Sequence, residues 1–545
     1  MKTVLVGLNA KHPHANLAIR LLTAAGRRQG LDVSFLDTHI NRPKGDILAD
    51  ILSHTTPPAV VGFSCYIWNI ALVRSLTADI RAVMPEMHII WGGPEVSFDP
   101  ETEWLQASHA PHAILAGECE DRFPAYLQAL ESGMLPEHMD IPGLYTQAHA
   151  KGMHAVHPAP DLTMHTTTFP LDLQPGQMAY FETSRGCPFS CTYCLSAPPV
   201  RTYPWDYIQT GLERLMAARV PTIKLVDRSF NAAPHTQRLL DFIIAQDTDT
   251  CFHLELEAHA LSEAVLDTLC SAPTGRFQVE IGVQSTCKAA LQAVGRPADF
   301  APIRHAVERL QAAHNMHIHL DLIAGLPYED YSTFARSFND VYALHPQMLQ
   351  LGFLKLLRGS KLRAQAAQYG IRYQADPPYE VLSTQWLGYA DMQRLHGVEA
   401  MLERFGACRR TMDMLATRHG GAFQAFEALW VYWQAHDYHH KPPAHKALWD
   451  ILHDFGADDA VLRWDYLTTG PQTVFPAWMD CPEANEPLRT KAQAWLAQSE
   501  WAHMSARQRD RVMRLAWFDG WWLFRYGGSG KMAVERVRVE RIVMG

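Results

Sequence analysis

Three cysteines within eight residues constrain this chain more than any other feature. Cys187, Cys191 and Cys194 follow a strand-like run with the spacing CxxxCxxC, and no fourth cysteine or histidine follows nearby. Structural zinc usually takes four protein ligands. A [4Fe-4S] cluster also has four irons that need ligands, so three cysteines would leave one iron open for a substrate or cosubstrate. The motif therefore predicts a reactive metal centre, and the alternatives are a zinc knuckle or three unrelated thiols.

The run from Ser184 to Cys194 resembles the cluster motif of radical S-adenosylmethionine (SAM) enzymes, and the aromatic Tyr193 before the last cysteine fits as well. In that family the unique iron binds the amino and carboxylate groups of SAM. An electron from the reduced cluster then cleaves SAM to methionine and a 5'-deoxyadenosyl radical. The resemblance implies a [4Fe-4S] cluster on Cys187, Cys191 and Cys194, SAM as cosubstrate, and an oxygen-sensitive enzyme.

Length and composition set the class of protein. A chain of 545 residues is too long for one ordinary core, so two to four domains are expected. Net charge is -9, which gives no general attraction to phosphate backbones and disfavours a nucleic-acid partner. The amino terminus is apolar only until Asn9 and no 18-residue apolar run follows, so we expect no membrane span and a cytoplasmic protein. Its ten cysteines are then reduced thiols or metal ligands.

The first 140 residues alternate short apolar runs with helical patterns. Strands are expected at 3–8, 31–36, 59–64, 88–92 and 113–116, and a helix is expected at 17–25. This order predicts a parallel, doubly wound (Rossmann-like) sheet, whose ligand lies beyond the carboxyl ends of the strands.

Directly before a radical SAM motif, such a domain resembles the cobalamin-binding domain of B12-dependent radical SAM enzymes. Trp91-Gly-Gly-Pro-Glu95 and Gly117-Glu118 are similar to that family's loops at strand ends. The resemblance implies cobalamin contacts from Asn9, His14, Ser64, Tyr66, Gly92, Gly93, Gly117 and Glu118. The classical signature DxHxxG is absent, because His12 and His14 lie in the corresponding loop at the wrong spacing. We therefore expect no histidine ligand below cobalt, and a solvated loop pair is the simpler interpretation of these two residues.

After a linker at 141–175, the alternation of strand and helix resumes. Six strands are expected at 178–183, 222–227, 252–257, 277–282, 317–323 and 348–354. Six repeats suit the partial (β/α)6 barrel of the radical SAM family over residues 176–360, with chemistry at the carboxyl ends of the strands.

Several polar residues of this region are candidate SAM contacts. Glu255 and Glu257 lie two apart on one expected strand, so both should face the same side, where a carboxylate needs a partner. The segments 281–285, 291–296 and 321–327 resemble radical SAM enzymes of the oxygen-independent coproporphyrinogen oxidase type. That resemblance implies SAM contacts from Glu255, Gln284, Arg296 and Asp321, and less directly from Asp227 and Glu280. A structural hydrogen-bond network inside the barrel is the alternative.

Residues 361–545 show helical spacing of apolar residues through 380–405, 421–436 and 489–526. We expect a mostly α-helical domain that caps the barrel and contacts the substrate. His436-Asp-Tyr-His439-His440 is interpreted as a mixed polar loop and not as a metal site. The fold class is thus α/β, with a Rossmann-like domain, a partial barrel and a helical carboxyl-terminal domain.

This domain order implies a cobalamin-dependent radical SAM enzyme. The leading hypothesis is a C-methyltransferase that acts on an unactivated carbon through the 5'-deoxyadenosyl radical and methylcobalamin. One alternative keeps both cofactors but performs cyclisation, rearrangement or redox chemistry, and another is a non-catalytic iron-sulfur or corrinoid sensor. We expect a small-molecule or peptide substrate, a reducing partner such as flavodoxin or ferredoxin, and a monomer.

Overall fold

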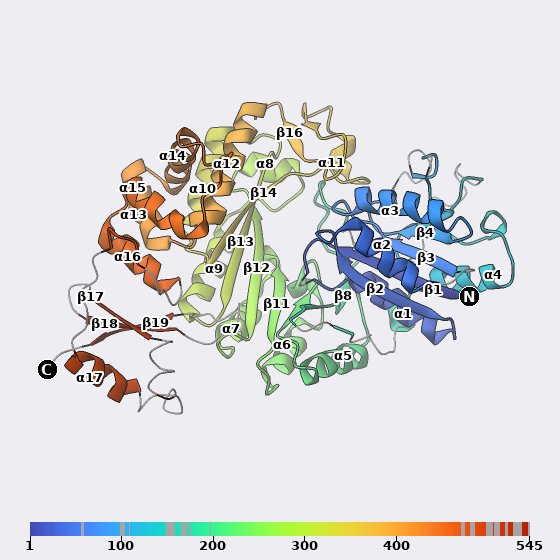
Figure 1. Cartoon of the computed structure of the whole chain (residues 1–545), viewed down its shortest axis with the longest axis horizontal. Coiled ribbons are helices and arrows are strands. Elements are labelled where there is room, and N and C mark those ends of the chain that lie inside the picture. The colour runs from blue at the N-terminus through green and yellow to red at the C-terminus, as the bar shows by residue number, and fades with distance from the viewer. Residues whose placement is uncertain are drawn as a thin grey trace. The chain divides into compact units, whose positions relative to one another are not determined.

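The computed structural model describes most of the chain (Figure 1). The described residues are 1–12, 14–55, 59–98, 104–107, 109–148, 159–164, 172–173, 176–196, 198–469, 475–479, 486–496, 505, 513–517, 521–526 and 537–542. They form two compact units. The first unit contains Met1–Leu261, Ala293–Arg296 and Phe353–Gln385, and the second contains Ser262–Gln292, Pro297–Gly352 and Trp386–Gly545.

The first unit begins with a six-stranded sheet in the order β2-β1-β3-β4-β5-β6. Its strands are β1 (Lys2–Asn9), β2 (Val33–His39), β3 (Ala59–Ser64), β4 (His88–Gly92), β5 (Ala113–Leu115) and β6 (Leu144–Tyr145). The pairs among β1 to β5 are parallel, as predicted, whereas β6 is antiparallel to β5. The predicted linker 141–175 therefore begins with an ordered edge strand. Its two residues are too few to show an alternating pattern in the sequence.

Helices cover both faces of this sheet. They are α1 (Leu17–Arg28), α2 (Lys44–Ser53), α3 (Ile70–Val83) and α4 (Arg122–Glu131). Val4 belongs to one buried apolar cluster with residues of α2 and α3, and the adjacent Leu5 belongs to a second cluster with residues of α1 and α4. Because successive residues of a strand face opposite sides, β1 is buried on both faces. The predicted doubly wound domain is confirmed.

A second six-stranded sheet has the order β14-β13-β12-β11-β10-β7. The first unit contributes β7 (Ala179–Phe181), β10 (Thr222–Leu225) and β11 (Cys251–Leu256), and the second contributes β12 (Phe277–Gln284), β13 (His317–Ala324) and β14 (Met348–Phe353). All six strands coincide with predicted ones. The helices that accompany them are α5 (Trp205–Ala217), α6 (Thr236–Ile244), α7 (Glu263–Cys270), α8 (Lys288–Ala293), α9 (Ala301–Ala313) and α10 (Tyr331–Tyr342).

The segment after β14 returns to the first unit. It contains α11 (Lys361–Ala364), β15 (Arg372–Tyr373) and β16 (Val381–Ser383). The helical part of the second unit follows, with α12 (Tyr389–Phe405), α13 (Arg409–His419), α14 (Ala422–Ala435), α15 (Leu448–Asp454), α16 (Asp459–Thr468) and α17 (Glu486–Leu496). Among the described residues, no helix has the length and apolar character needed to cross a membrane.

The helix predicted through 489–526 is confirmed as far as Leu496 and is wrong at Met513–Trp517 and Trp521–Tyr526, while most of the residues between these elements lie outside the described part of the chain. The chain forms a three-stranded antiparallel sheet there, from β17 (Met513–Trp517), β18 (Trp521–Tyr526) and β19 (Val537–Ile542). The sequence of β18, Trp-Trp-Leu-Phe-Arg-Tyr, is rich in aromatic residues that favour strands. Apolar residues are so dense in this segment that they fit a helical period by chance. This match conceals the preference of the aromatic residues for a strand.

Candidate active site

The three cysteines lie in a loop that a short hairpin closes. Strands β8 (Ser184–Arg185) and β9 (Arg201–Thr202) pair antiparallel on either side of the loop. Cys187 and Cys191 are partly buried and Cys194 is exposed. The amide of Cys194 donates to the carbonyl of Cys191 at 3.1 Å, which forms a turn between the second and third cysteine.

The number of ligands in the loop favours an iron-sulfur cluster over zinc. The loop offers three cysteines, and no fourth cysteine or histidine follows nearby. Structural zinc usually takes four protein ligands. In an iron-sulfur cluster each cysteine binds a different iron, and three cysteines leave one iron open. The loop therefore fits a cluster better than a zinc knuckle.

Arg296 lies beside the cysteine loop. Its Nη1 is 3.7 Å from Cys191 Sγ and 3.5 Å from the hydroxyl of Tyr193, and its Nη2 donates to Glu257 Oε2 at 2.8 Å. The amide of Thr192 also donates to the carbonyl of Val294 at 3.0 Å, which ties the loop to the segment that carries Arg296. Burial raises the pKa of the Cys191 thiol, and the neighbouring Arg296 opposes that rise.

The two glutamates predicted to share one face have different partners. Glu255 forms ion pairs with Lys224 at 3.0 Å and Arg228 at 3.6 Å. Glu257 instead pairs with the guanidinium of Arg296 and with Nδ1 of His259. Strand β11 ends at Leu256, so the strand periodicity that grouped the two residues does not extend to Glu257. The carboxylate that reaches Arg296 beside the cysteines is thus Glu257, whereas the resemblance had singled out Glu255.

Gln284 and Asp321 lie in the second unit, on the paired strands β12 and β13. Gln284 has a φ of +68° where the register of the two strands shifts. A Cβ built on Gly282, which lies opposite Asp321, would be 2.3 Å from Gln284 Nε2, so the glutamine side chain folds back over this glycine. Asp321 Oδ1 is 3.0 Å from His319 Nε2, and Glu280 is the cross-strand partner of His319. Burial raises the pKa of Asp321, and nearby Glu280 raises it further.

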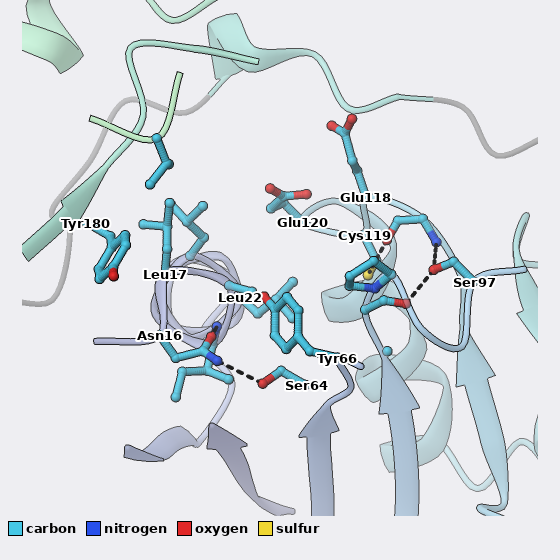
Figure 2. Close-up of a pocket in the computed structure, with 18 of the residues that line it drawn as sticks. Asn16, Leu17, Leu22, Ser64, Tyr66, Ser97, Glu118, Cys119, Glu120 and Tyr180 are labelled. Atoms are coloured by element: carbon cyan, nitrogen blue, oxygen red, sulfur yellow. Dashed lines mark hydrogen bonds between the residues drawn. The ribbon is translucent and has the colours of Figure 1, made fainter. Parts of the chain in front are cut away.

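A cavity of about 850 Å³ lies beyond the carboxyl ends of β1, β3, β4 and β5 (Figure 2). All eight residues predicted to contact cobalamin line it: Asn9, His14, Ser64, Tyr66, Gly92, Gly93, Gly117 and Glu118. The cysteine hairpin contributes further lining residues, namely Ser184, Arg185, Gly186, Leu195 and Ser196. The volume is near the upper end of the range for ligand pockets, roughly 300–1,000 Å³. One cavity therefore borders both predicted cofactor loops.

Hydrogen bonds fix the strand-end loops around this cavity. Asn16 caps α1 by accepting from the amide of Ile19 at 3.2 Å, and its Nδ2 donates to Ser64 Oγ at 2.9 Å. Ser97 Oγ donates to the carbonyl of Gly93 at 2.7 Å and accepts from the amide of Gly117 at 2.8 Å (Figure 2). Sequence reasoning missed Asn16 and Ser97. Asn16 stands before the predicted helix, where an N-cap asparagine is common, and could have been found from that position.

His14 and Tyr66 occupy the cavity wall in different ways. The Nδ1 of His14 is hydrogen-bonded to the hydroxyl of Tyr180, and burial, followed by the charges of Lys11 and Lys224, lowers the pKa of His14. Tyr66 stacks on Trp68 with ring centres 4.3 Å apart. Burial raises the pKa of Tyr66 to about 12, so it is a neutral phenol at ordinary pH. The cavity thus combines a neutral imidazole and a neutral aromatic surface.

Arg185 joins the cysteine hairpin to the loop after β5. Its guanidinium lies 2.8 Å from Glu118, 2.7 Å from Glu120 and 2.6 Å from Glu182. Burial alone would lower the pKa of Arg185, but the carboxylates of Glu182 and Glu120 raise it. Glu118 also pairs with Arg201 at 2.5 Å. The carboxylate of Glu118 is therefore held by two arginines, and a cobalamin contact from this residue would use its backbone or a shared oxygen.

Asp227 holds the strand that leads into the cysteine loop. Its buried carboxylate accepts from the amide of Thr183 at 3.1 Å and from the hydroxyls of Thr183 and Ser184 at 2.6 and 2.5 Å. Burial raises the pKa of Asp227 to about 6, and these donors oppose the rise. Since three donors already engage its carboxylate, Asp227 supports the loop structurally and is a poorer candidate for a SAM contact than the sequence indicated.

A distant segment supports the loop after β4. Glu95 Oε1 accepts from Arg358 Nε at 3.2 Å and from the Tyr379 hydroxyl at 2.5 Å. The Arg358 guanidinium also lies 4.8 Å from the ring centre of Trp104. Burial raises the pKa of Glu95, whereas the bonds from Tyr379 and Arg358 oppose that rise. This buried contact fixes the residue that follows Gly92-Gly93-Pro94.

Comparison with known families and structures agrees with this arrangement. Residues 3–127 match the B12 binding domain, residues 181–341 match the radical SAM superfamily, and residues 367–519 match a family described as a protein of unknown function (DUF4080).

The curated relatives and solved structures match different shares of the chain. The cobalamin-dependent radical SAM methyltransferase TokK of Streptomyces tokunonensis is 24% identical over 58% of this chain and 50% of its own length. The hopanoid C-3 methylase of Methylococcus capsulatus is 26% identical over 45% of this chain and 48% of its own. The chain thus spans about half the length of these curated relatives. The cobalamin-dependent SAM radical enzyme OxsB shares the fold, with a TM-score of 0.61 over 91% of this chain and 78% of its own at 14% identity.

A B12 binding domain is thus followed by a radical SAM domain, and residues on both sides of the three cysteines line a cavity together with the B12 binding domain. Over these two domains the chain is similar to cobalamin-dependent radical SAM enzymes.

Proposed function

We propose that this chain is a cobalamin-dependent radical SAM methyltransferase that adds a methyl group to an unactivated carbon. The observation that carries the proposal is the cavity of about 850 Å³, which both the strand-end loops of the B12 binding domain and the cysteine hairpin line. A radical formed at the hairpin and a methyl donor on the strand-end loops would face the same space. The curated relatives TokK and hopanoid C-3 methylase, both methylating enzymes, support this choice of reaction.

The residues present fit both cofactors. Cys187, Cys191 and Cys194 would hold a [4Fe-4S] cluster, because three cysteines are one ligand short of a structural zinc site and leave one iron of a cluster open. Cobalamin would lie against the strand-end loops, where Gly93 allows close approach of the backbone and Tyr66 offers a flat apolar surface. When bound, the cluster with SAM supplies a carbon radical and the corrin supplies the methyl group. Glu255, Gln284, Arg296 and Asp321 remain candidate SAM contacts.

The residues of the chain itself would bind and orient the two cofactors and enclose the reactive intermediate. Leu17, Leu22 and Leu195 give the cavity apolar wall on both sides, which excludes water from a reactive intermediate. Arg185 and its three glutamates fix the loop after β5 against the hairpin, so the two cofactor loops keep one spacing. We further propose a small-molecule or peptide substrate, a flavodoxin- or ferredoxin-like reductant and a monomeric state.

Cofactor content tests the first part of the proposal. The protein is produced without oxygen in cells supplied with cobalamin, and iron and corrin are quantified together with the ultraviolet-visible spectrum. We expect about four irons, as one [4Fe-4S] cluster requires, and one corrin per chain. Iron without corrin would mean that the strand-end loops bind a different ligand, and the methyltransferase proposal would fall.

Product stoichiometry tests the reaction. The loaded enzyme is incubated with SAM labelled in its methyl group, a one-electron reductant and candidate substrates. Methyl transfer should yield S-adenosylhomocysteine and 5'-deoxyadenosine in equal amounts, with the label in the product. Formation of 5'-deoxyadenosine without S-adenosylhomocysteine would instead support cyclisation, rearrangement or redox chemistry, and no SAM cleavage would support a sensor.

A further inference from the structure

Arg296 spans a cluster ligand and a carboxylate with the two arms of its guanidinium. One arm points to the sulfur of Cys191 at 3.7 Å, and the other donates to Glu257 at 2.8 Å. A guanidinium is planar and carries a full charge, so this geometry places a fixed positive charge between the sulfur and the carboxylate. Glu255, the other acidic residue considered for this site, pairs with Lys224 and Arg228.

The pair is shielded from solvent. The side chains of Arg296 and Glu257 are only 10% and 9% exposed. Charges that water does not surround act more strongly on their neighbours than charges at a surface. Salt screens the charge of a surface arginine, whereas it should screen the largely buried charge of Arg296 much less.

Glu257 is itself held firmly. Its carboxylate bonds His259 Nδ1 at 2.9 Å, and its backbone amide and carbonyl each form a 2.9 Å hydrogen bond with the side chain of Asn231. These bonds leave the carboxylate little freedom to follow Arg296 if the arginine moves. Glu257 therefore determines where the guanidinium sits relative to Cys191.

Reduction of a cluster adds one negative charge close to its cysteine sulfurs. A positive group that donates a hydrogen bond to such a sulfur stabilises the reduced form, and a negative group at similar distance stabilises the oxidised form. Arg296 and Glu257 thus act in opposite directions, with the positive member nearer to Cys191.

We propose that Arg296, positioned by Glu257, sets how readily the cluster on Cys187, Cys191 and Cys194 accepts an electron, independently of any contact with SAM. The inference rests on the proposed function only in requiring that these cysteines hold a cluster. Arg296 raises the reduction potential and Glu257 lowers it. The two residues are positioning residues for the electron-transfer step, in which a low-potential one-electron donor is oxidised and the cluster is reduced.

The test uses the full chain loaded with its cluster and free of SAM. Arg296→Met and Glu257→Gln are compared with the wild type by potentiometric titration with viologen mediators, and electron paramagnetic resonance measures the reduced cluster. At a fixed potential, Arg296→Met should lower the ratio of reduced to oxidised cluster by about tenfold, equivalent to about 59 mV for one electron. Glu257→Gln keeps a side-chain oxygen that can accept the hydrogen bond from Arg296 but removes the negative charge, so it should raise this ratio.

The opposite signs separate electrostatics from damage to the loop, because damage would move both variants in the same direction. Arg42→Met and Asp50→Asn, which alter a surface ion pair of 2.7 Å with 33% and 40% exposed side chains, are the matched controls and should leave the ratio unchanged. If the Arg296→Met protein loses iron, Arg296→Gln is measured in its place. The direction in which Glu257→Gln changes the ratio of reduced to oxidised cluster still tests the proposal.

Two results would overturn the inference in distinguishable ways. Unchanged ratios in both variants, with iron content equal to the wild type, would refute the electrostatic role and leave the proposed function intact. A wild-type protein that holds no [4Fe-4S] cluster would refute the proposed function and the inference together.

Discussion

Arg185 Nη1 lies 2.8 Å from Glu118 Oε2, which joins the residue two positions before the first cysteine of the CxxxCxxC motif to the residue that follows Gly117. The same guanidinium binds Glu120 and Glu182. The loop of the B12 binding domain and the start of the cysteine hairpin therefore depend on one side chain, and the geometry of one cofactor loop is coupled to the other.

Replacing Arg185 by methionine should weaken corrin binding even in protein that lacks the cluster. Its side chain is 14% exposed, and removing one partner from a largely buried charge group leaves the other partners uncompensated, at a cost of about 3–5 kcal/mol. We expect the affinity for hydroxocobalamin to fall at least about tenfold, measured by spectroscopic titration. Arg228→Met is the matched control, because Arg228 also lines the cavity but is 60% exposed, and its effect should be much smaller. Equal effects of the two substitutions would contradict the role of Arg185.

Replacing Gly93 by alanine should distort the loop after β4. Gly93 has a φ of +110°, and a Cβ there would lie 2.6 Å from the carbonyl oxygen of Cys65. Gly133 also has a positive φ, of +83°, but open space surrounds its Cβ position. Gly133→Ala should thus show only the backbone cost of about 1 kcal/mol, while Gly93→Ala should cost more and weaken corrin binding. Thermal unfolding and corrin titration of both variants provide the comparison, and similar behaviour of the two would refute it.

Replacing Cys194 by alanine should abolish SAM cleavage and leave corrin binding intact. A cluster that loses one of three cysteine ligands should be lost or inactive, whereas Cys194 is not among the residues that line the cavity. Iron content, 5'-deoxyadenosine formation and corrin titration measure the three properties. Loss of corrin binding in a folded variant would show that the two sites are not separable at this position.

Acid should destabilise the first unit through His88. This imidazole bonds the Tyr126 hydroxyl at 2.6 Å and stacks on His112, and burial, followed by His112 and Arg81, lowers its pKa to about 4. Between pH 6.5 and 4 the unfolded chain binds a proton at His88 that the folded chain does not, so the free energy of unfolding falls as the pH falls through this window.

The substitution His88→Gln removes the side chain that binds this proton in the unfolded chain. The stability advantage of the wild type over His88→Gln should therefore shrink by about 2 kcal/mol between pH 7 and pH 5, as urea titrations at both values can measure. The variant His138→Gln, at an exposed position, should follow the pH dependence of the wild type. A constant difference between wild type and His88→Gln at the two pH values would mean that folding does not lower the pKa of His88.

The strands and the cavity were predictable because both follow from local pattern and topology. Apolar runs such as β1 and β3 are buried on both faces and are readily recognised, and ligands of parallel sheets lie beyond the strands' carboxyl ends. That rule placed Asn9, Ser64 and Gly92 at one site, and all three line the cavity. Their contact with cobalamin stays a prediction.

The partners of charged residues were not predictable, since they depend on contacts between distant segments. Nothing in the sequence near Arg185 reveals that Glu118 and Glu120 bind it, and nothing near Glu257 reveals Arg296 as its partner. The choice of Glu255 over Glu257 came from the family resemblance, and the strand periodicity that grouped the two residues ends at Leu256, one residue before Glu257. The carboxyl-terminal sheet was missed because apolar density, and not period, dominates that segment.

The contact between Glu95 and Arg358 has a consequence for how the protein is made. The two residues are 263 positions apart, so a ribosome working at about 5–20 residues per second needs roughly 13–50 s to produce Arg358 after Glu95. During that interval the newly made B12 binding domain has a carboxylate whose partners do not yet exist. Corrin binding should accordingly require translation as far as Tyr379. Nascent chains arrested before Arg358 should fail to retain the corrin.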